Sequence, residues 1–284
     1  MKKTERASIA EETVKIIKDG YYFSEEGTQI NISPDIEQCK ANTTIYKPDE
    51  FDKLKPAIST QVEPLTTEIE VINDTSLSVA RQMVNEGKYQ HVVCLNFASA
   101  KNPGGGFLGG SQAQEESLAR SSALYGSLLE MREYYEYNRK GRSCLYSDYM
   151  IFSPNVPVFR DDAGKLLQQP YLLSFITAPA VNAGAVRKNE HNNVDKIKSV
   201  MISRAEKVLS VVAYHHCDAL ILGAWGCGVF RNDPVDVAEM WFTLLKENVL
   251  FVNRFKKVSF AVIDGQKRGI YQTFVDKFCG ARSF

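Results

Sequence analysis

The sequence predicts an α/β domain, a mixed sheet flanked by helices, with a mainly helical N-terminal accessory layer added to it. Beyond residue 66, short runs rich in β-branched residues alternate with helix-length amphipathic stretches, which is typical of layered α/β domains. The chain has 284 residues, of which 44% are hydrophobic, enough for one large core. Residues 1–66 are too few to hold a core of their own easily, so we expect them to pack on a core of 67–284 and not to form an independent domain.

The N-terminal layer begins with one clear helical pattern. The apolar residues of 5–19 fall on one side of a helix, and Gly20 is a suitable end for it. Residues 21–66 contain four prolines among polar side chains. They predict an irregular layer with a short hairpin and one short helix near 48–54.

The core shows the alternation of strands and helices more regularly. Its apolar β-branched runs predict strands at 68–72, 92–97, 149–152, 172–178, 219–223 and 258–263. The amphipathic stretches between them predict helices at 76–86, 114–132, 194–214, 235–246 and 271–278, and 161–164 has the composition of a turn.

Charge and cysteine content exclude several classes of function. The chain has 34 Lys and Arg residues and 34 Asp and Glu residues, so its formal net charge is zero. A neutral protein has no general electrostatic attraction for nucleic acid, and any phosphate group must be bound by residues in its immediate surroundings. We therefore expect no sequence-specific nucleic acid partner. The six cysteines form no CxxC pair and the four histidines form no HxxxH pattern, so neither a metal nor another cofactor is expected.

The same features predict the location of the protein. Scattered cysteines in an enzyme-sized chain indicate reduced thiols in a cytosol. The N-terminus shows no apolar signal-peptide region, and no apolar run is long enough to cross a membrane. A cytoplasmic monomer that does not contact a membrane is the expectation.

A glycine-rich loop follows the predicted strand 92–97. Five of the seven residues of 104–110 are glycine. Glycine allows a positive φ and lets a ligand approach the backbone, whose N–H groups can bind phosphate or ribose oxygens. The candidate ligand-binding residues here are Asn102, Gly104, Gly105 and Gly106.

Two glutamates follow that loop. Ser111 and Gln114 fit a capping box, which predicts that the next helix begins at about Ser111 and that Glu115 and Glu116 lie near its first turn. Neighbouring helix residues point about 100° apart, so Glu115 lies nearer the apolar side and Glu116 points away from it. The helix dipole alone explains many glutamates at such positions, but a glycine loop beside the pair favours a ligand site at the end of a strand.

A second glycine loop follows the predicted strand 219–223. Asp233 is a suitable N-cap for the next helix, with Pro234 at its first position. Such a loop can offer several N–H groups to a diphosphate. Its candidate ligand-binding residues are Gly226, Cys227, Gly228, Val229 and Phe230. For Phe230 the alternative is a core aromatic, and Cys227 lacks the neighbouring histidine expected of a nucleophile.

Three glycines, seven residues and then Gln-Glu-Glu form a spacing that resembles the signature of poly(ADP-ribose) glycohydrolases. The string NFASAKNPGGGFLGGSQAQEESLARSSALY is similar to the bacterial-type branch of that family, as are SPNVPVFRD and GAWGCGVFRND. The family fold is a macrodomain with N-terminal additions. The resemblance implies that Glu116 is the catalytic acid, that Glu115 orients the ribose with Gln114 beside it, and that the second glycine loop wraps the diphosphate with Phe230 against the ligand.

The resemblance implies hydrolysis of the ribose–ribose bond of poly(ADP-ribose), on polymer or on ADP-ribosylated proteins, with release of ADP-ribose. A non-catalytic reader of ADP-ribose and a hydrolase of mono-ADP-ribosylated protein are the alternatives. The glutamate pair argues against a reader, which needs neither carboxylate. Whether the helix terminus lowers the pKa of Glu116, or burial and the charge of Glu115 raise it, is left open by the sequence.

Overall fold

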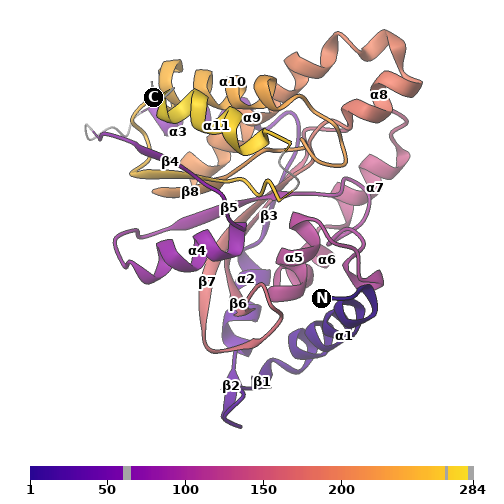
Figure 1. Ribbon diagram of the computed structural model, residues 1–284, viewed down its shortest axis with the longest axis vertical. Coiled ribbons are helices and arrows are strands. Elements are labelled where there is room, and N and C mark those ends of the chain that lie inside the picture. Colours follow the sequence, from indigo (N-terminus) through magenta and orange to yellow (C-terminus); the bar gives the residue numbers. More distant parts are fainter. Residues whose placement is uncertain (60–64, 266–267, 281–284) are drawn as a thin grey trace.

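A seven-stranded sheet forms the centre of the molecule in the computed structural model, which describes residues 1–59, 65–265 and 268–280 (Figure 1). The strand order is β3-β6-β7-β5-β8-β9-β4. The pairs from β7 to β4 are parallel, whereas β3-β6 and β6-β7 are antiparallel, which confirms the mixed sheet. The strands are β3 (Thr44–Tyr46), β4 (Glu68–Ile72), β5 (Val92–Phe97), β6 (Met150–Arg160), β7 (Leu166–Ala178), β8 (Ala219–Leu222) and β9 (Lys257–Ala261).

Helices cover both faces of the sheet. Successive side chains of β5 point to opposite faces, so Val93 and Leu95 enter one apolar cluster while Val92 and Cys94 enter the other. One cluster is closed by α3 (Lys55–Ser59), α9 (Lys196–Tyr214), α10 (Pro234–Phe242) and α11 (Ile270–Cys279). The other is closed by α2 (Ser33–Asn42), α4 (Ser76–Asn85), α5 (Gln114–Ser121), α6 (Leu124–Glu130) and α7 (Arg132–Lys140).

The N-terminal region agrees with the prediction at its start. Helix α1 (Lys3–Asp19) ends at Gly20, whose φ of 76° is left-handed and whose N–H bonds the Ile16 carbonyl. The predicted hairpin is present as β1 (Tyr21–Phe23) and β2 (Gln29–Asn31). Helix α2 was not predicted, because few of its residues are apolar. Strand β3 pairs with β6, so this region also contributes an edge strand to the sheet. The division at residue 66 stays a prediction.

Two predictions for the middle of the chain were wrong in extent. The single helix expected over 114–132 is two helices, α5 and α6, and α7 begins only at Arg132. The break between α5 and α6 arises because Ser122 takes up extended backbone and bridges Val158 in β6. Strands β6 and β7 are much longer than predicted and form a hairpin around the predicted turn 161–164. Two prolines and a register shift between Ser153 and Val156 interrupt the alternation that would have revealed the full length of β6.

The predicted elements of the C-terminal half agree with the structure to within a few residues, but the seven-residue helix α8 (Ala183–Asn189) was not predicted. Helix α9 spans 19 residues, and α10 ends at Phe242, where a π-helical turn (Thr243–Glu247) continues the predicted helix. Within the described residues, no helix combines the length and the apolar character needed to span a membrane.

Candidate active site

The two glycine loops leave the same edge of the sheet. Strands β5 and β8 are parallel neighbours, with Cys94 opposite Ile221, so their carboxyl ends lie together. The first glycine loop (98–113) follows β5 and the second glycine loop (223–233) follows β8. A Cβ on Gly223 would lie 3.0 Å from the Phe97 ring, which places the starts of the loops in contact. This is the edge at which open α/β sheets bind ligands.

Gly105 lies between the two glutamates. Gly104 and Gly105 both have positive φ, of 66° and 60°. A Cβ on Gly105 would come within 2.5 Å of Glu116 Oε1 and 3.1 Å of Glu115 Oε2. The absence of a side chain at this position therefore makes room for the protein's own carboxyl groups, as well as for any ligand.

Glu115 is almost fully enclosed, with 3% of its surface exposed. Its Oε2 accepts a hydrogen bond of 2.6 Å from the Ser99 N–H, and its Oε1 accepts a longer one of 3.4 Å from Asn96 Nδ2. Burial raises the pKa of Glu115 to about 8; the Ser99 N–H opposes the rise and the neighbouring charge of Glu116 adds to it. Glu115 is therefore mostly an uncharged acid near neutral pH, able to donate a hydrogen bond.

Glu116 has a different environment from its neighbour. It is half-buried, and its Oε1 accepts a hydrogen bond of 3.0 Å from the Gly106 N–H in the first glycine loop. The predicted contrast is confirmed: Glu115 faces inward and Glu116 faces the loop. The two carboxyl groups thus meet one glycine segment from adjacent helix positions.

The start of α5 is held by Gln114 and not by the predicted capping box. The helix begins at Gln114, and no side chain caps it at Ala113. Gln114 Oε1 accepts a hydrogen bond of 2.8 Å from the Phe97 N–H, and its Nε2 donates to the Leu95 carbonyl at 2.7 Å. The capping box was wrong because Ser111 lies within the loop, where its N–H bonds the Gly106 carbonyl. Gln114 therefore ties the glutamates to the end of β5, and its contact with a ligand stays a prediction.

The second glycine loop is more open than the first. Gly226 has a φ of 76°, and a Cβ there would lie 2.7 Å from that of Ala180, whereas one on Gly228 would meet no atom within 4 Å. Val229 is 82% exposed. Burial raises the pKa of the Cys227 thiol to about 12, which argues against a nucleophilic thiolate.

Phe230 lies at the end of that loop beside a second aromatic ring. It is half-buried, and its ring centroid lies 6.0 Å from that of Tyr146, so it packs on Tyr146 and on the core without being enclosed. Its carbonyl accepts a hydrogen bond of 2.9 Å from Gly184 at the start of α8 (Ala183–Asn189). Asp233 caps α10 as predicted, accepting from the Val235 N–H at 2.8 Å.

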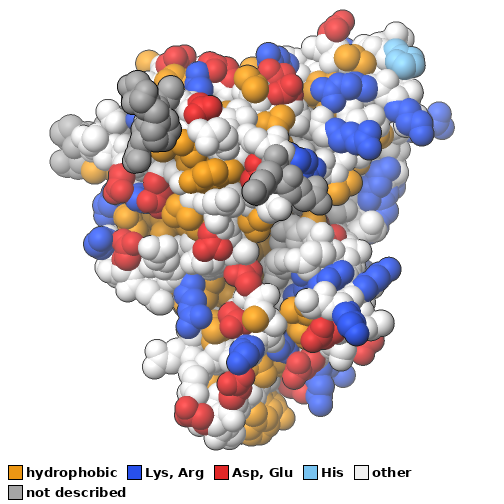
Figure 2. All heavy atoms as spheres, viewed as in Figure 1, with side chains coloured by type: hydrophobic (Ala, Val, Ile, Leu, Met, Phe, Trp, Pro, Cys, Tyr) orange, Lys and Arg blue, Asp and Glu red, His pale blue; other side chains and the backbone are white. Residues whose placement is uncertain are grey.

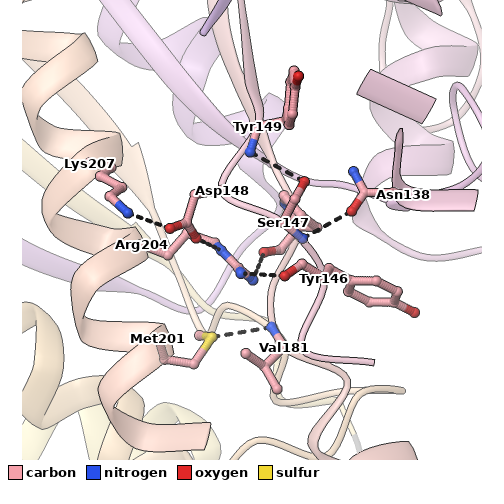
Figure 3. Close-up of polar contacts among 10 residues, drawn as sticks. Asn138, Tyr146, Ser147, Asp148, Tyr149, Val181, Met201, Arg204 and Lys207 are labelled. Carbon is pink, nitrogen blue, oxygen red and sulfur yellow. Dashed lines mark hydrogen bonds and ion pairs between the residues drawn. The ribbon is translucent and has the colours of Figure 1, made fainter. Parts of the chain in front are cut away.

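Tyr146 is held in an unusual conformation by a buried arginine. Its φ is 59°, in the left-handed region that non-glycine residues rarely adopt. Arg204 of α9 is 1% exposed and donates to the carbonyls of Tyr146 at 3.2 Å and Pro179 at 2.9 Å (Figure 3). Its Nε bonds Asp148 at 2.8 Å, and Lys207 pairs with the same carboxylate.

One signal of this cluster is present in the sequence, although the prediction did not use it. Arg204 falls among the apolar positions of a long helix, where a charge requires a buried partner. Although burial alone would raise it, Arg204 and Lys207 hold the pKa of Asp148 below its usual value. Arg204, Lys207 and Asp148 together carry one more positive than negative charge. Arg204 contacts the backbone of Tyr146, whose ring packs beside Phe230.

A chain of contacts continues from α9 to the second glycine loop. Met201 Sδ accepts a hydrogen bond of 3.3 Å from the Val181 N–H, as drawn in Figure 3. The Val181 carbonyl accepts one of 2.8 Å from Asn232 Nδ2, which also bonds the Gly226 carbonyl at 3.2 Å. Helix α9 therefore supports both the loop and the Tyr146 segment.

Comparison with known proteins identifies the family. Residues 10–161 match the family described as microbial-type PARG, catalytic domain, where PARG is poly(ADP-ribose) glycohydrolase. The chain belongs to this family. The PARG from Thermomonospora curvata superposes with a TM-score of 0.92 at 42% identity, over 97% of this chain and all of that one.

Two structures with bound ligands are also similar. The T. curvata PARG bound to the inhibitor ADP-HPD gives a TM-score of 0.90 with the same identity and coverage. PARG from Deinococcus radiodurans in complex with ADP-ribose gives 0.80 at 40% identity, over 85% of this chain and 96% of that one. Among curated proteins, no match was found. The comparisons confirm the macrodomain-like fold and the predicted activity, that of a poly(ADP-ribose) glycohydrolase and hence a glycoside hydrolase.

Proposed function

We propose that Glu116 is the general acid and base with which this PARG cuts the ribose–ribose bond of poly(ADP-ribose). The observation that carries the assignment is the contrast between the two glutamates around Gly105. Glu115 is enclosed and accepts a hydrogen bond from Ser99, whereas Glu116 lies at the loop and accepts a hydrogen bond from the Gly106 N–H. A group that exchanges protons with substrate and water must be reachable, and of the pair Glu116 is the more accessible.

The proposed reaction follows from the chemistry of an acetal-type bond. The carboxyl group of Glu116 gives its proton to the leaving ribose oxygen as the bond to the anomeric carbon breaks, through a transition state with oxocarbenium character. The resulting carboxylate then takes a proton from water, whose oxygen bonds the anomeric carbon and whose proton restores the acid. The products are ADP-ribose and a polymer shorter by one unit.

Glu115 has a supporting part in this proposal. Because burial keeps it protonated near neutral pH, it can donate a hydrogen bond to a ribose oxygen and fix the sugar relative to Glu116. The backbone N–H groups of the loops would hold the ligand around it. Asn102, Gly104, Gly105 and Gly106 of the first loop would contact the distal ribose. Gly226, Cys227, Gly228 and Val229 of the second loop would contact the diphosphate, with Phe230 packed against it.

The wider setting is also part of the proposal. Free poly(ADP-ribose) and ADP-ribosylated proteins are the expected substrates, no sequence-specific nucleic acid or membrane is an expected partner, and we expect a cytoplasmic monomer. T. curvata PARG binds ADP-HPD and D. radiodurans PARG binds ADP-ribose, and their likeness to this chain supports the same product here.

The test is incubation with poly(ADP-ribose) followed by chromatography for free ADP-ribose. We expect ADP-ribose to accumulate as the polymer shortens. A protein that binds ADP-ribose tightly and never shortens the polymer would be a reader. Release from mono-ADP-ribosylated protein without release from polymer would identify the other hydrolase class.

A further inference from the structure

Exposed basic side chains gather over α7 and α8 on the face shown in Figure 2. Lys101 lies in the first glycine loop, and Arg139, Lys140 and Arg142 lie in the last turn of α7 or just after it. Arg187 and Lys188 lie in the last turn of α8, and Arg231 lies in the second glycine loop. These seven, the basic strip, are all exposed, and none forms an ion pair with a carboxylate of the described part of the chain.

One end of the basic strip joins the first glycine loop. Arg139 Nε donates a hydrogen bond of 2.8 Å to the carbonyl of Lys101, the residue before Asn102. Lys101 also lies near Cys144: burial raises the pKa of that thiol, and the Lys101 ammonium opposes the rise. The strip therefore begins at the loop that holds the two glutamates and continues along 139–144.

The other end joins the second glycine loop. The carbonyl of Cys144 accepts a hydrogen bond of 2.9 Å from Asn182, the N-cap of α8. From the last turn of α8, Arg187 Nη1 donates to the Arg231 carbonyl at 2.9 Å. Arg231 directly follows Phe230, and its side chain packs over Gly184. The strip thus runs beside the site from one loop to the other.

The charge of the strip is local and not a property of the whole protein. Lys+Arg and Asp+Glu balance at 34 each over the chain. The acidic side chains within or next to the same helices that lack a basic partner are Glu136 and Glu190. The Glu190 carboxylate accepts hydrogen bonds from Ser143 Oγ and from the Cys144 N–H. An excess of cations remains beside the site, where an anionic ligand would meet it.

We propose that the basic strip binds the poly(ADP-ribose) chain beyond the unit being cut. This rests on the proposed function, because Glu116 cleaves a bond whose leaving side carries the rest of the polymer, and the strip starts at the same loop. Each further ADP-ribose unit carries a negatively charged diphosphate. The attraction between the polymer and the Lys and Arg side chains of the basic strip therefore increases with every unit that reaches the strip. Such contacts add affinity that weakens with salt.

The test compares two triple variants that remove the same charge. Lys140→Gln, Arg142→Gln and Lys188→Gln together remove three exposed cations of the basic strip whose side chains form no ion pair in the described part of the chain. Lys18→Gln, Lys53→Gln and Lys246→Gln remove three exposed cations elsewhere. For the strip variant we expect KM for long poly(ADP-ribose) to rise about three- to tenfold at low salt, kcat and the Kd for free ADP-ribose to stay unchanged, and the slope of log KM against log salt to flatten. The control triple should match the parent.

The contrary results are distinct. An unchanged KM for long polymer in the strip variant would overturn the proposal. So would an equal rise of the strip variant's KM for a two-unit substrate, or an equal rise of KM for long polymer in the control triple. So would tighter binding of single-stranded RNA than of polymer of equal charge, measured in a Glu116→Gln background. Failure of the parent protein to cut polymer would overturn the proposed function instead. The basic strip would then still be tested by comparing polymer binding of Glu116→Gln proteins with and without the three strip substitutions.

Discussion

The two glycine loops give the same signal in the sequence and have different surroundings in the structure. In the first, the space that a side chain would occupy at Gly105 is taken by the carboxyl groups of Glu115 and Glu116. In the second, a side chain at Gly228 would meet nothing, and neighbouring Val229 is exposed. The first loop is therefore built around the protein's own acid groups, and the second offers its backbone outward. Changes in the first should impair chemistry, and changes in the second should impair binding.

The largest effect is expected for Glu116→Gln. The amide keeps the size of the side chain and cannot supply a proton, so release of ADP-ribose from polymer should fall by about 10²–10⁴-fold or more. Calorimetry should show ADP-ribose binding close to that of the parent. Turnover near the parental rate would show that the acid is another group, with Glu115 the first to examine because of its raised pKa.

Gly105→Ala tests the first loop without altering either glutamate. The new Cβ would collide with Glu116 Oε1 at 2.5 Å in a left-handed backbone, so the carboxyl group must move. A displacement of about 1 Å can cost on the order of 10² in rate, and we expect kcat to fall by that order. Gly228→Ala is the matched control in the second loop and should leave kcat within about twofold. Equal kcat in the two variants would remove the distinction between the loops.

Gly226→Val tests the second loop. The valine side chain would crowd Ala180, and a β-branched residue would have to adopt the left-handed backbone conformation of Gly226. The loop should therefore shift away from a diphosphate. We expect ADP-ribose affinity to weaken about tenfold or more, measured by calorimetry on protein whose circular dichroism matches the parent. Unchanged affinity in such a folded variant would count against this loop as the diphosphate site.

Glu115→Gln should reveal the raised pKa of the buried carboxyl as a change in stability. The ordinary pKa is 4.5 and the folded value is about 8, so the folded state binds the extra proton between these values and loses stability as pH rises through that window. The parent should lose on the order of a few kcal/mol between pH 5 and 8.5 that the variant keeps. Thermal melting of both proteins across that range measures it. Parallel melting curves would mean that Glu115 is ionised in the folded protein.

The smallest effect is expected from chelation. The sequence shows no metal-ligand spacing in or beside either glycine loop. Polymer cleavage should therefore continue unchanged in excess EDTA. Loss of turnover that magnesium or zinc restores would require a different account of the site.

The sequence predicted the parts of the site that depend on local pattern. Strand ends, glycine loops and the inward and outward directions of the two glutamates follow from periodicities of two and about 3.6 residues, and these were confirmed. The site residues themselves stay predictions in their roles. The role of Gly105 beside the carboxyl groups needed coordinates, since no pattern states what a missing side chain would meet.

Long-range features were beyond prediction. The predicted helix over 114–132 is divided into α5 and α6 because Ser122 bridges Val158, a residue distant in sequence. The long β6–β7 hairpin is hidden by prolines. The support of Tyr146 by Arg204 joins residues 58 positions apart. Such contacts arise from tertiary packing, which overrides local preference.

The buried Arg204 also has a consequence for how the chain folds. A guanidinium can be enclosed at low cost when its carboxylate and carbonyl partners are already in place, and an unpaired buried charge costs several kcal/mol. Docking of α9 in a shifted register would separate Arg204 from Asp148 and from the Pro179 and Tyr146 carbonyls. Packing of α9 in the observed register and the backbone conformation at Tyr146, beside Phe230, therefore depend on the same buried side chain.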